Sequence, residues 1–176
     1  MQDIFERIDE LYEELITLRR DFHMHPELGF EEQRTAGIIE QYLRDLGLSP
    51  QRMTKTGVVA LIEGAYPGPV LMLRADIDAL PIEEENDVPY KSKKPGVMHA
   101  CGHDAHTAML LIAAKILAEK RDQIKGTIKL VFQPNEEIAG AIHMINDGVL
   151  ENPKVDAVMG QHIWSFMKSG TVAVTS

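Results

Sequence analysis

Histidine, cysteine and acidic side chains gather in a few short segments of this 176-residue chain. The densest is MHACGHDAH at 98–106, with three histidines, one cysteine and one aspartate. LRADIDALP at 73–81 carries two aspartates, QPNEE at 133–137 ends in two glutamates, and GQH at 160–162 ends in a histidine. Imidazole, thiolate and carboxylate groups are the usual protein ligands of divalent metal ions. The four segments together therefore indicate a metal site.

Each segment taken alone has an ordinary explanation. An aspartate such as Asp76 or Asp78 is often a turn or cap residue, and an acidic pair often opens a helix. Cys101 alone would more often be a small buried hydrophobe than a ligand, and His162 alone would be a loop histidine. The metal interpretation is favoured because all of these groups occur together, with three histidines and the cysteine within eight residues.

The elements that must position these groups follow from the apolar pattern. Apolar residues at three- and four-residue steps predict amphipathic helices over 3–22 and 31–46. Short apolar runs at 58–62 and 70–73, with a Pro-Gly-Pro turn at 67–69 between them, predict buried strands. The remaining predicted elements are a helix at 106–119, a strand at 127–132, a helix at 137–149, and strands at 155–159 and 171–174.

Strands that alternate with helices predict an α/β fold, with a mainly parallel sheet flanked by helices. Composition and length predict one domain over residues 1–176. In open parallel sheets, ligands bind beyond the carboxyl ends of the strands. Asp76 and Asp78 follow one predicted strand, Glu136 and Glu137 the next, and His162 a third. We therefore expect them to meet Cys101 and its neighbours at one edge of the sheet.

The ligand types narrow the choice of metal and of reaction. Cys101 and His103 are two residues apart, so on an extended segment they point the same way. Sulfur, nitrogen and carboxylate ligands suit zinc, manganese or another first-row ion, nickel and cobalt included, better than calcium or magnesium. One glutamate of the pair can bind metal while the other takes a proton from water and passes it to a leaving amine.

At this point the chain resembles the M20 metallopeptidase family. The resemblance rests on RRDFHMHPELGFEE, LRADIDALP, MHACGHDAHTAMLL, FQPNEEIAGA and GQH, which occur in this order. It is closest to the amidohydrolase branch, which contains hippurate hydrolases, N-acyl-amino-acid amidohydrolases, N-acetyldiaminopimelate deacetylases and plant auxin-conjugate hydrolases. This resemblance implies the catalytic domain of an enzyme that uses two divalent metal ions to hydrolyse N-acyl amino acids or short peptides.

The resemblance also implies a role for individual residues. Its metal ligands correspond to Cys101, His103, Glu137 and His162, and its general base corresponds to Glu136. Asp78 would orient a ligand. Asp76, Asp104 and His106 lie in matching motifs without an implied role. The glycine-rich stretch that usually follows the glutamate pair is here Ile-Ala-Gly-Ala at 138–141.

Other classes of function are disfavoured. The formal charge of -9 and the lack of a long basic run argue against nucleic acid as a partner. No Gly-x-Gly or phosphate-loop motif occurs, which argues against dinucleotide or ATP chemistry. No apolar leader or membrane-length apolar stretch is found, and Cys101 is the single cysteine, so we expect a cytoplasmic protein without membrane contact.

Two alternatives remain open from the sequence. Cys101 could act as a thiol nucleophile with a histidine base, although the glutamate pair and His162 would then have no task. The second alternative is a metal- or ligand-binding fragment without turnover. Family members continue into a lid domain, which supports a homodimer, and return with a further histidine ligand, whereas the seven histidines here all lie at or before His162.

We therefore expect residues 1–176 alone to bind metal less tightly than a full-length relative and to turn over little or no substrate. Water would replace one ligand, and without the lid the substrate would be held in poorer geometry, which costs on the order of 100-fold in rate even for small misplacement. Metal retained after dialysis and hydrolysis of N-acyl amino acids with added manganese or zinc are the measurements. Turnover equal to that of a full-length relative would contradict this expectation.

Overall fold

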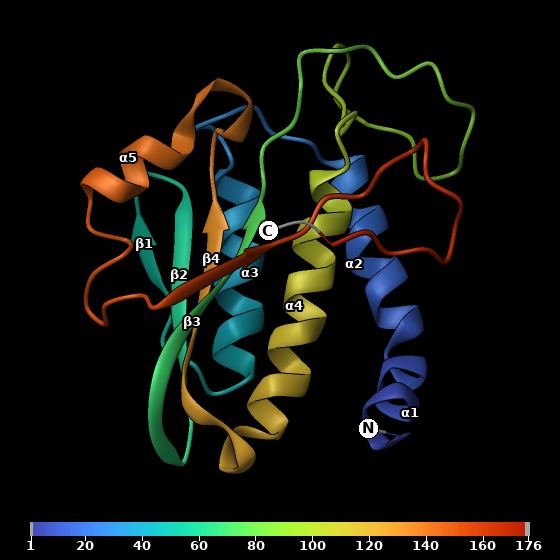
Figure 1. Ribbon diagram of the computed structural model, residues 1–176. Helices are drawn as coiled ribbons and strands as arrows, with labels where there is room; N and C mark the ends of the chain where they lie inside the picture. Colours follow the sequence, from blue (N-terminus) through green and yellow to red (C-terminus); the bar gives the residue numbers. More distant parts are fainter. Residues whose placement is uncertain (1, 175–176) are drawn as a thin grey trace.

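A five-stranded sheet forms the centre of the computed structural model, which describes residues 2–174 (Figure 1). The strand order is β1-β2-β4-β3-β5. The strands are β1 (Gln51–Met53), β2 (Gly57–Glu63), β3 (Tyr66–Asp76), β4 (Lys125–Gln133) and β5 (Ala157–Gly160). The helices are α1 (Gln2–Glu10), α2 (Tyr12–Met24), α3 (Gln33–Asp45), α4 (His103–Glu119) and α5 (Gly140–Asn146). Short 3₁₀ turns occupy Arg121–Gln123 and Glu136–Ile138.

The α/β class and the flanking helices are as predicted, and the strand directions are mixed. β3 pairs in parallel with both β4 and β5, whereas β2 runs antiparallel to β4 and to β1. The crossover from β3 to β4 through α4 permits the parallel pairing. β3, β4 and β5 therefore end at the same edge of the sheet.

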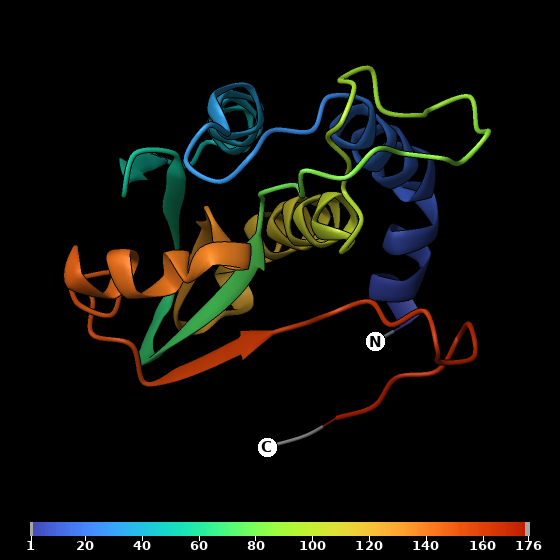
Figure 2. The ribbon, with the colours of Figure 1, turned by 90° about the horizontal axis from the view of Figure 1, so that it is seen from above.

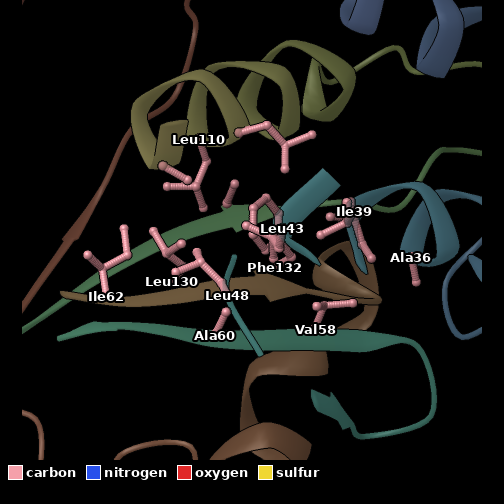
Figure 3. Close-up of a cluster of buried hydrophobic side chains, with 14 of the residues drawn as sticks. Ala36, Ile39, Leu43, Leu48, Val58, Ala60, Ile62, Leu110, Leu130 and Phe132 are labelled. Atoms are coloured by element: carbon pink, nitrogen blue, oxygen red, sulfur yellow. The ribbon is translucent and has the colours of Figure 1, made fainter. Parts of the chain in front are cut away.

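Both faces of the sheet are covered by apolar side chains that alternate along the strands. Val58, Ala60 and Ile62 of β2 face one side, where α3 and α4 pack, and Val59 faces the other, where α5 packs (Figures 1 and 3). The larger cluster also contains Phe22, Ala36, Ile39, Leu43, Leu48, Ala75, Ile77, Leu110, Leu111, Ala114, Leu130 and Phe132. α2 lies outside α4, on the side away from the sheet (Figure 2).

Two of the predicted N-terminal elements have different boundaries in the structure. The helix predicted over 3–22 is two helices that meet at Leu11, where the backbone tightens and Leu11 N bonds both Arg7 O and Ile8 O. Leu11 is buried against Ile112 and Ile116 of α4. The Pro-Gly-Pro segment at 67–69 is part of β3, not a turn. Its prolines are tolerated because β5 pairs only with Leu71–Arg74, so this part of β3 has a free side.

The last predicted helix and strand also differ. The helix predicted from Glu137 begins instead at Gly140, because Ala139 has the positive φ of 61° and separates the 3₁₀ turn from α5. The strand predicted over 171–174 is irregular and exposed in the structure, and no strand of the described residues pairs with it. None of the helices described is both long and apolar enough to cross a bilayer.

Burial separates two phenylalanines that are otherwise chemically equal. Phe132 is 0% exposed in the core between β4 and the helices, whereas Phe5 on α1 is 65% exposed. We expect Phe132→Ala to lower the free energy of unfolding by about 3–5 kcal/mol, because it removes apolar contacts and leaves a cavity. Phe5→Ala is the matched control and should change it by no more than about 0.5 kcal/mol. Urea denaturation of both variants tests this; equal effects would contradict the assigned core.

A buried polar network joins α2 to α4. His23 Nδ1 lies 2.8 Å from Asp104 Oδ2, and its Nε2 lies 3.0 Å from Glu84 Oε1. Arg19 Nε bonds the same Asp104 oxygen at 2.8 Å. The hydrogen bond to Asp104 is the main cause that raises the pKa of His23, against burial and the nearby Arg19, with Glu84 adding to it.

This raised pKa predicts a pH dependence of stability. Because the folded pKa of His23 exceeds the unfolded one, its contribution is complete below about pH 6.5 and is lost as the pH rises through the folded pKa. The free energy of unfolding should therefore fall over that range, and His23→Gln should remove this part of the slope. Urea denaturation at a series of pH values is the measurement, and identical slopes in wild type and variant would contradict it.

Candidate metal centre

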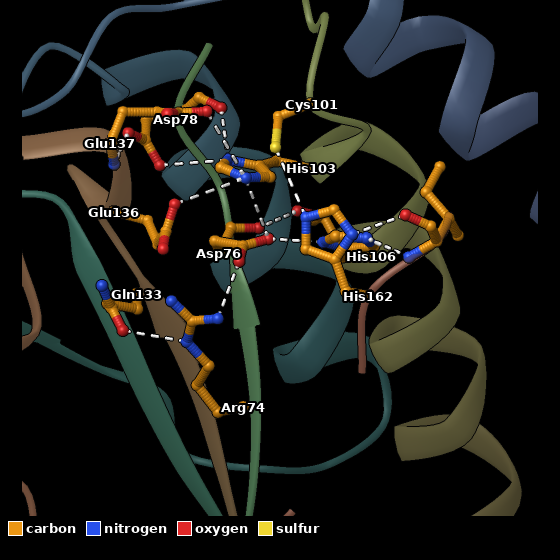
Figure 4. Close-up of polar contacts among 12 residues, drawn as sticks. Arg74, Asp76, Asp78, Cys101, His103, His106, Gln133, Glu136, Glu137 and His162 are labelled. Atoms are coloured by element: carbon orange, nitrogen blue, oxygen red, sulfur yellow. Dashed lines mark hydrogen bonds and ion pairs between the residues drawn. The ribbon is translucent and has the colours of Figure 1, made fainter. Parts of the chain in front are cut away.

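The sheet edge at which β3, β4 and β5 end gathers the chemically active side chains (Figure 4). Asp78 follows β3, the Glu136–Glu137 pair follows β4, and His162 follows β5. His103 is the first residue of α4, and Cys101 precedes it across Gly102, whose positive φ of 90° turns the chain into the helix. The structure thus brings together all the side chains that the sequence predicted for the site.

His103 lies at the centre of this group. Its Nδ1 is 2.9 Å from the main-chain oxygen of Asp78 and 3.3 Å from Oδ1 of the same residue. A proton on Nδ1 leaves the lone pair on Nε2, which has no hydrogen-bond partner among the described residues although the ring is buried. Nε2 lies 3.7 Å from Glu136 Oε2 and 3.8 Å from Glu137 Oε1.

A buried imidazole nitrogen that faces carboxylates and accepts no hydrogen bond is a suitable ligand for a divalent cation. Two sets of residues share His103, and within each set the ligand atoms all lie within 4.8 Å of one another. These sets are Cys101–His103–His162 and His103–Glu136–Glu137. Cys101 Sγ itself lies 3.4 Å from His162 Nε2. The donors present therefore fit divalent metal ions.

The pKa values of Cys101 and His103 are both raised. Burial, reinforced by Glu137, raises the pKa of the Cys101 thiol to about 11. Burial opposes protonation of His103, but Asp78 and Asp76 outweigh it and raise the pKa of the imidazole. The raised pKa of His103, and the part of the Cys101 shift that Glu137 causes, reflect an excess of negative charge, which a bound cation would offset.

Asp78 contacts two of the predicted ligands at once. Besides its contacts with His103, its Oδ2 accepts a hydrogen bond of 3.1 Å from the main-chain N–H of Glu137. One carboxylate therefore fixes the orientation of the imidazole and the position of the glutamate turn. This geometry fits the orienting role that the resemblance implies for Asp78.

In a third set of close ligand atoms, Asp76–His103–His106, Asp76 and His106 form a hydrogen-bonded chain that does not include His103, whose Nε2 lies 3.7 Å from Asp76 Oδ1. His106 Nδ1 lies 2.6 Å from Asp76 Oδ1, and its Nε2 accepts the N–H of Ile163 at 2.9 Å. Both ring nitrogens are thus engaged, and His106 holds the residue after His162 in place. Arg74 completes the chain by donating to Asp76 at 2.7 Å and to Gln133 at 2.9 Å.

The sequence assigned no role to Asp76 and His106, because a histidine that only forms hydrogen bonds cannot be told from a metal-binding one by its place in the motif. Burial opposes ionisation of Asp76, yet the hydrogen bond with His106 and the charges of His103 and Arg74 outweigh it and lower its pKa. Asp104 belongs to the His23 network instead. Arg74 was missed altogether, although its place two residues before Asp76 on a strand put both on one face.

A cavity of about 680 Å³ adjoins the centre on the side of α2. Cys101 and His162 line it, together with His99, Tyr90 and Trp164. This volume is within the range of small-molecule sites. His99 is buried, and within residues 2–174 neither of its ring nitrogens has a hydrogen-bond partner; burial lowers its pKa to about 4.

Comparison with known proteins bears on this arrangement. The model of Peptidase family M20/M25/M40 matches residues 72–176. An N-acyl-L-amino acid amidohydrolase of Geobacillus stearothermophilus is 47% identical over 98% of this chain and 47% of its own length. An N-acetyl-L-cysteine deacetylase of Bacillus subtilis is 48% identical over 95% of this chain and 40% of its own length.

Solved structures agree with the sequence comparison. The Bacillus subtilis YXEP protein, described as a dinuclear metal binding peptidase from the M20 family, superposes with a TM-score of 0.83. It is 45% identical and covers 88% of this chain and 44% of its own. The chain spans less than half the length of each of these relatives. With the family model matched over more than half of its residues, the chain belongs to peptidase family M20/M25/M40.

Proposed function

We propose that the protein containing this chain hydrolyses the amide bond of N-acyl amino acids or short peptides, with two divalent metal ions held at the His103 centre. The observation that carries the proposal is the buried His103 Nε2, unpartnered and surrounded by Cys101, His162 and the glutamate pair. The relatives named above supply the class of substrate. Zinc or manganese suits the mixed ligands best, and nickel or cobalt also fits.

Cys101, His103, Glu137 and His162 would hold the ions. An imidazole nitrogen has one lone pair, so His103 binds one ion, and the two sets that share it mark adjacent positions. Divalent ions in such a site polarise the amide carbonyl and make water a stronger acid. The remaining steps are carried out by the protein side chains.

Glu136 is the better general base of the pair. Its side chain is 39% exposed and lies close to His103, whereas that of Glu137 is 25% exposed and also lies beside Cys101, and the main chain of Glu137 is tied to Asp78. The carboxylate of Glu136 accepts the proton of the attacking water and donates it to the leaving amine. One residue thus serves both proton transfers.

The thiol-nucleophile alternative is weaker in this geometry. His162 lies close enough to Cys101 to act as a base, but the surroundings raise the pKa of the thiol to about 11 and so disfavour a thiolate without a cation. Removal of metal by a chelator should abolish hydrolysis, and re-addition should restore it. The alternative predicts activity without metal and loss on thiol alkylation. Dimerisation and cytoplasmic location stay predictions from the resemblance and the sequence.

The adjacent glutamates provide a matched pair of variants. Glu136→Gln should keep bound metal and lower kcat by roughly 10²- to 10⁴-fold, because the amide keeps the shape and cannot accept a proton. Glu137→Gln should instead weaken metal binding, because it removes an anionic ligand. Metal content and hydrolysis of N-acetyl and N-benzoyl amino acids are measured together in the protein that contains the full chain. Near-normal turnover by Glu136→Gln would remove Glu136 from the mechanism.

A further inference from the structure

The turn that carries Glu136 and Glu137 has little apolar anchoring. It is three residues long, Glu136–Ile138, and the Ile138 side chain is 76% exposed. Asn135 and Ala139 flank it with positive φ values of 53° and 61°, a conformation that costs free energy for residues other than glycine. Polar contacts must therefore hold this turn in place.

Bonds within the segment fix its shape. The main-chain oxygen of Asn135 accepts the N–H of Gly140 at 2.7 Å and that of Ile138 at 3.3 Å, and its side-chain amide donates to Ile138 O at 3.2 Å. Gly140 is required here, because a Cβ on it would lie 1.9 Å from Pro134 O. These bonds are all local, so they do not determine where the turn lies relative to His103.

Two carboxylates outside the segment hold its main-chain N–H groups. Asp78 accepts the N–H of Glu137, as described above, and Glu32 Oε1 accepts the N–H of Asn135 at 2.9 Å. Glu32 comes from the loop before α3 and is 0% exposed. Its other oxygen accepts the hydroxyl of Thr56 at 2.6 Å.

The loop of Glu32 also packs closely on the same residue. A Cβ added to Gly29 would lie 1.9 Å from Asn135 Oδ1, so only glycine permits this approach. No lysine, arginine or histidine of the described residues pairs with Glu32. Burial accordingly raises its pKa, against the hydrogen bonds from Thr56 and Asn135. A buried acid without a cationic partner is costly, and its visible task is to hold Asn135.

We infer that Glu32 is a positioning residue for the glutamate turn, holding Asn135 in its left-handed conformation so that Glu137 reaches the metal and Glu136 the water. The inference rests on the proposed function, but its first readout is metal binding and needs no substrate. Thr56 assists by fixing the rotamer of Glu32. The segments around Glu32 and Glu136, far apart in sequence, thereby act as one unit.

Three variants of the full-length protein test this role. Glu32→Ala should weaken metal binding about 10-fold or more and lower kcat on the order of 10- to 100-fold with little change in KM, because the ligand and base shift while the substrate contacts remain. Glu32→Gln should restore both, since its carbonyl oxygen can accept from Asn135 N–H and its amide can donate to the Thr56 hydroxyl. Glu31→Ala, at the exposed neighbouring glutamate, should change neither.

Zinc and manganese affinities are measured by chelator competition, and kcat and KM well below the melting temperature of each variant. Glu32→Ala that melts earlier but keeps wild-type metal affinity and kcat would reduce Glu32 to a structural residue and overturn the inference. If Glu32→Ala does not fold, the single variants Glu32→Gln and Thr56→Val, which both keep an acceptor for the N–H of Asn135, should retain at least half of the wild-type metal affinity. A larger loss in either would overturn the inference. Metal binding that responds as expected without any hydrolysis would leave the inference standing and refute the proposed function.

Discussion

Parallel pairing of β3 with β4 on one side and β5 on the other is the constraint on which the candidate centre depends. It makes three strands end at one edge, so residues from distant parts of the chain meet there. The pairing requires a crossover, and α4 provides it while carrying His103 in its first turn. Apolar side chains on both faces of the sheet supply the burial that makes this arrangement stable.

Because two of these strands, β3 and β4, deliver acidic residues to this one edge of the sheet, the edge carries an excess of negative charge. Asp76, Asp78 and the glutamate pair all lie near His103, and Arg74 is the one arginine or lysine among the described residues that pairs with any of them. The raised pKa of His103, caused by Asp78 and Asp76 against burial, reflects that imbalance, and Glu137 adds to the effect of burial in raising the pKa of Cys101. A fold that concentrates anions in this way is stabilised by cation binding, so metal affinity and the stability of the site are linked.

The sequence predicted the residues of the centre better than the contacts that hold them. Cys101, His103 and His162 could be predicted because residues of metal-ligand type that follow predicted strands form a local sequence pattern. Glu32 could not be predicted, because the sequence does not distinguish it from the adjacent Glu31. Only the packing of their loop on Asn135 buries Glu32 and leaves Glu31 exposed. Long-range contacts of this kind have no period and no composition that a local pattern could reveal.

The same reason explains the errors in the elements. The break at Leu11 depends on its contacts with Ile112 and Ile116, and the extended prolines at 67–69 depend on how far β5 reaches along β3. The helix expected from Glu137 fails at Ala139, an alanine whose left-handed conformation runs against its intrinsic preference for helix. In each case tertiary contacts outweigh the local preference of the residues for a helix or a turn.

The three histidines of MHACGHDAH show how partners divide one motif among different tasks. His106 uses both nitrogens in hydrogen bonds and so serves to place Ile163, next to His162. His103 uses one and keeps the other free toward the carboxylates. His99 uses neither and stays neutral in a buried wall of the cavity. Residue type alone therefore does not decide which histidine is suited to bind metal. The suitable histidine is the one in which an oxygen holds one ring nitrogen and the other ring nitrogen faces negative charge.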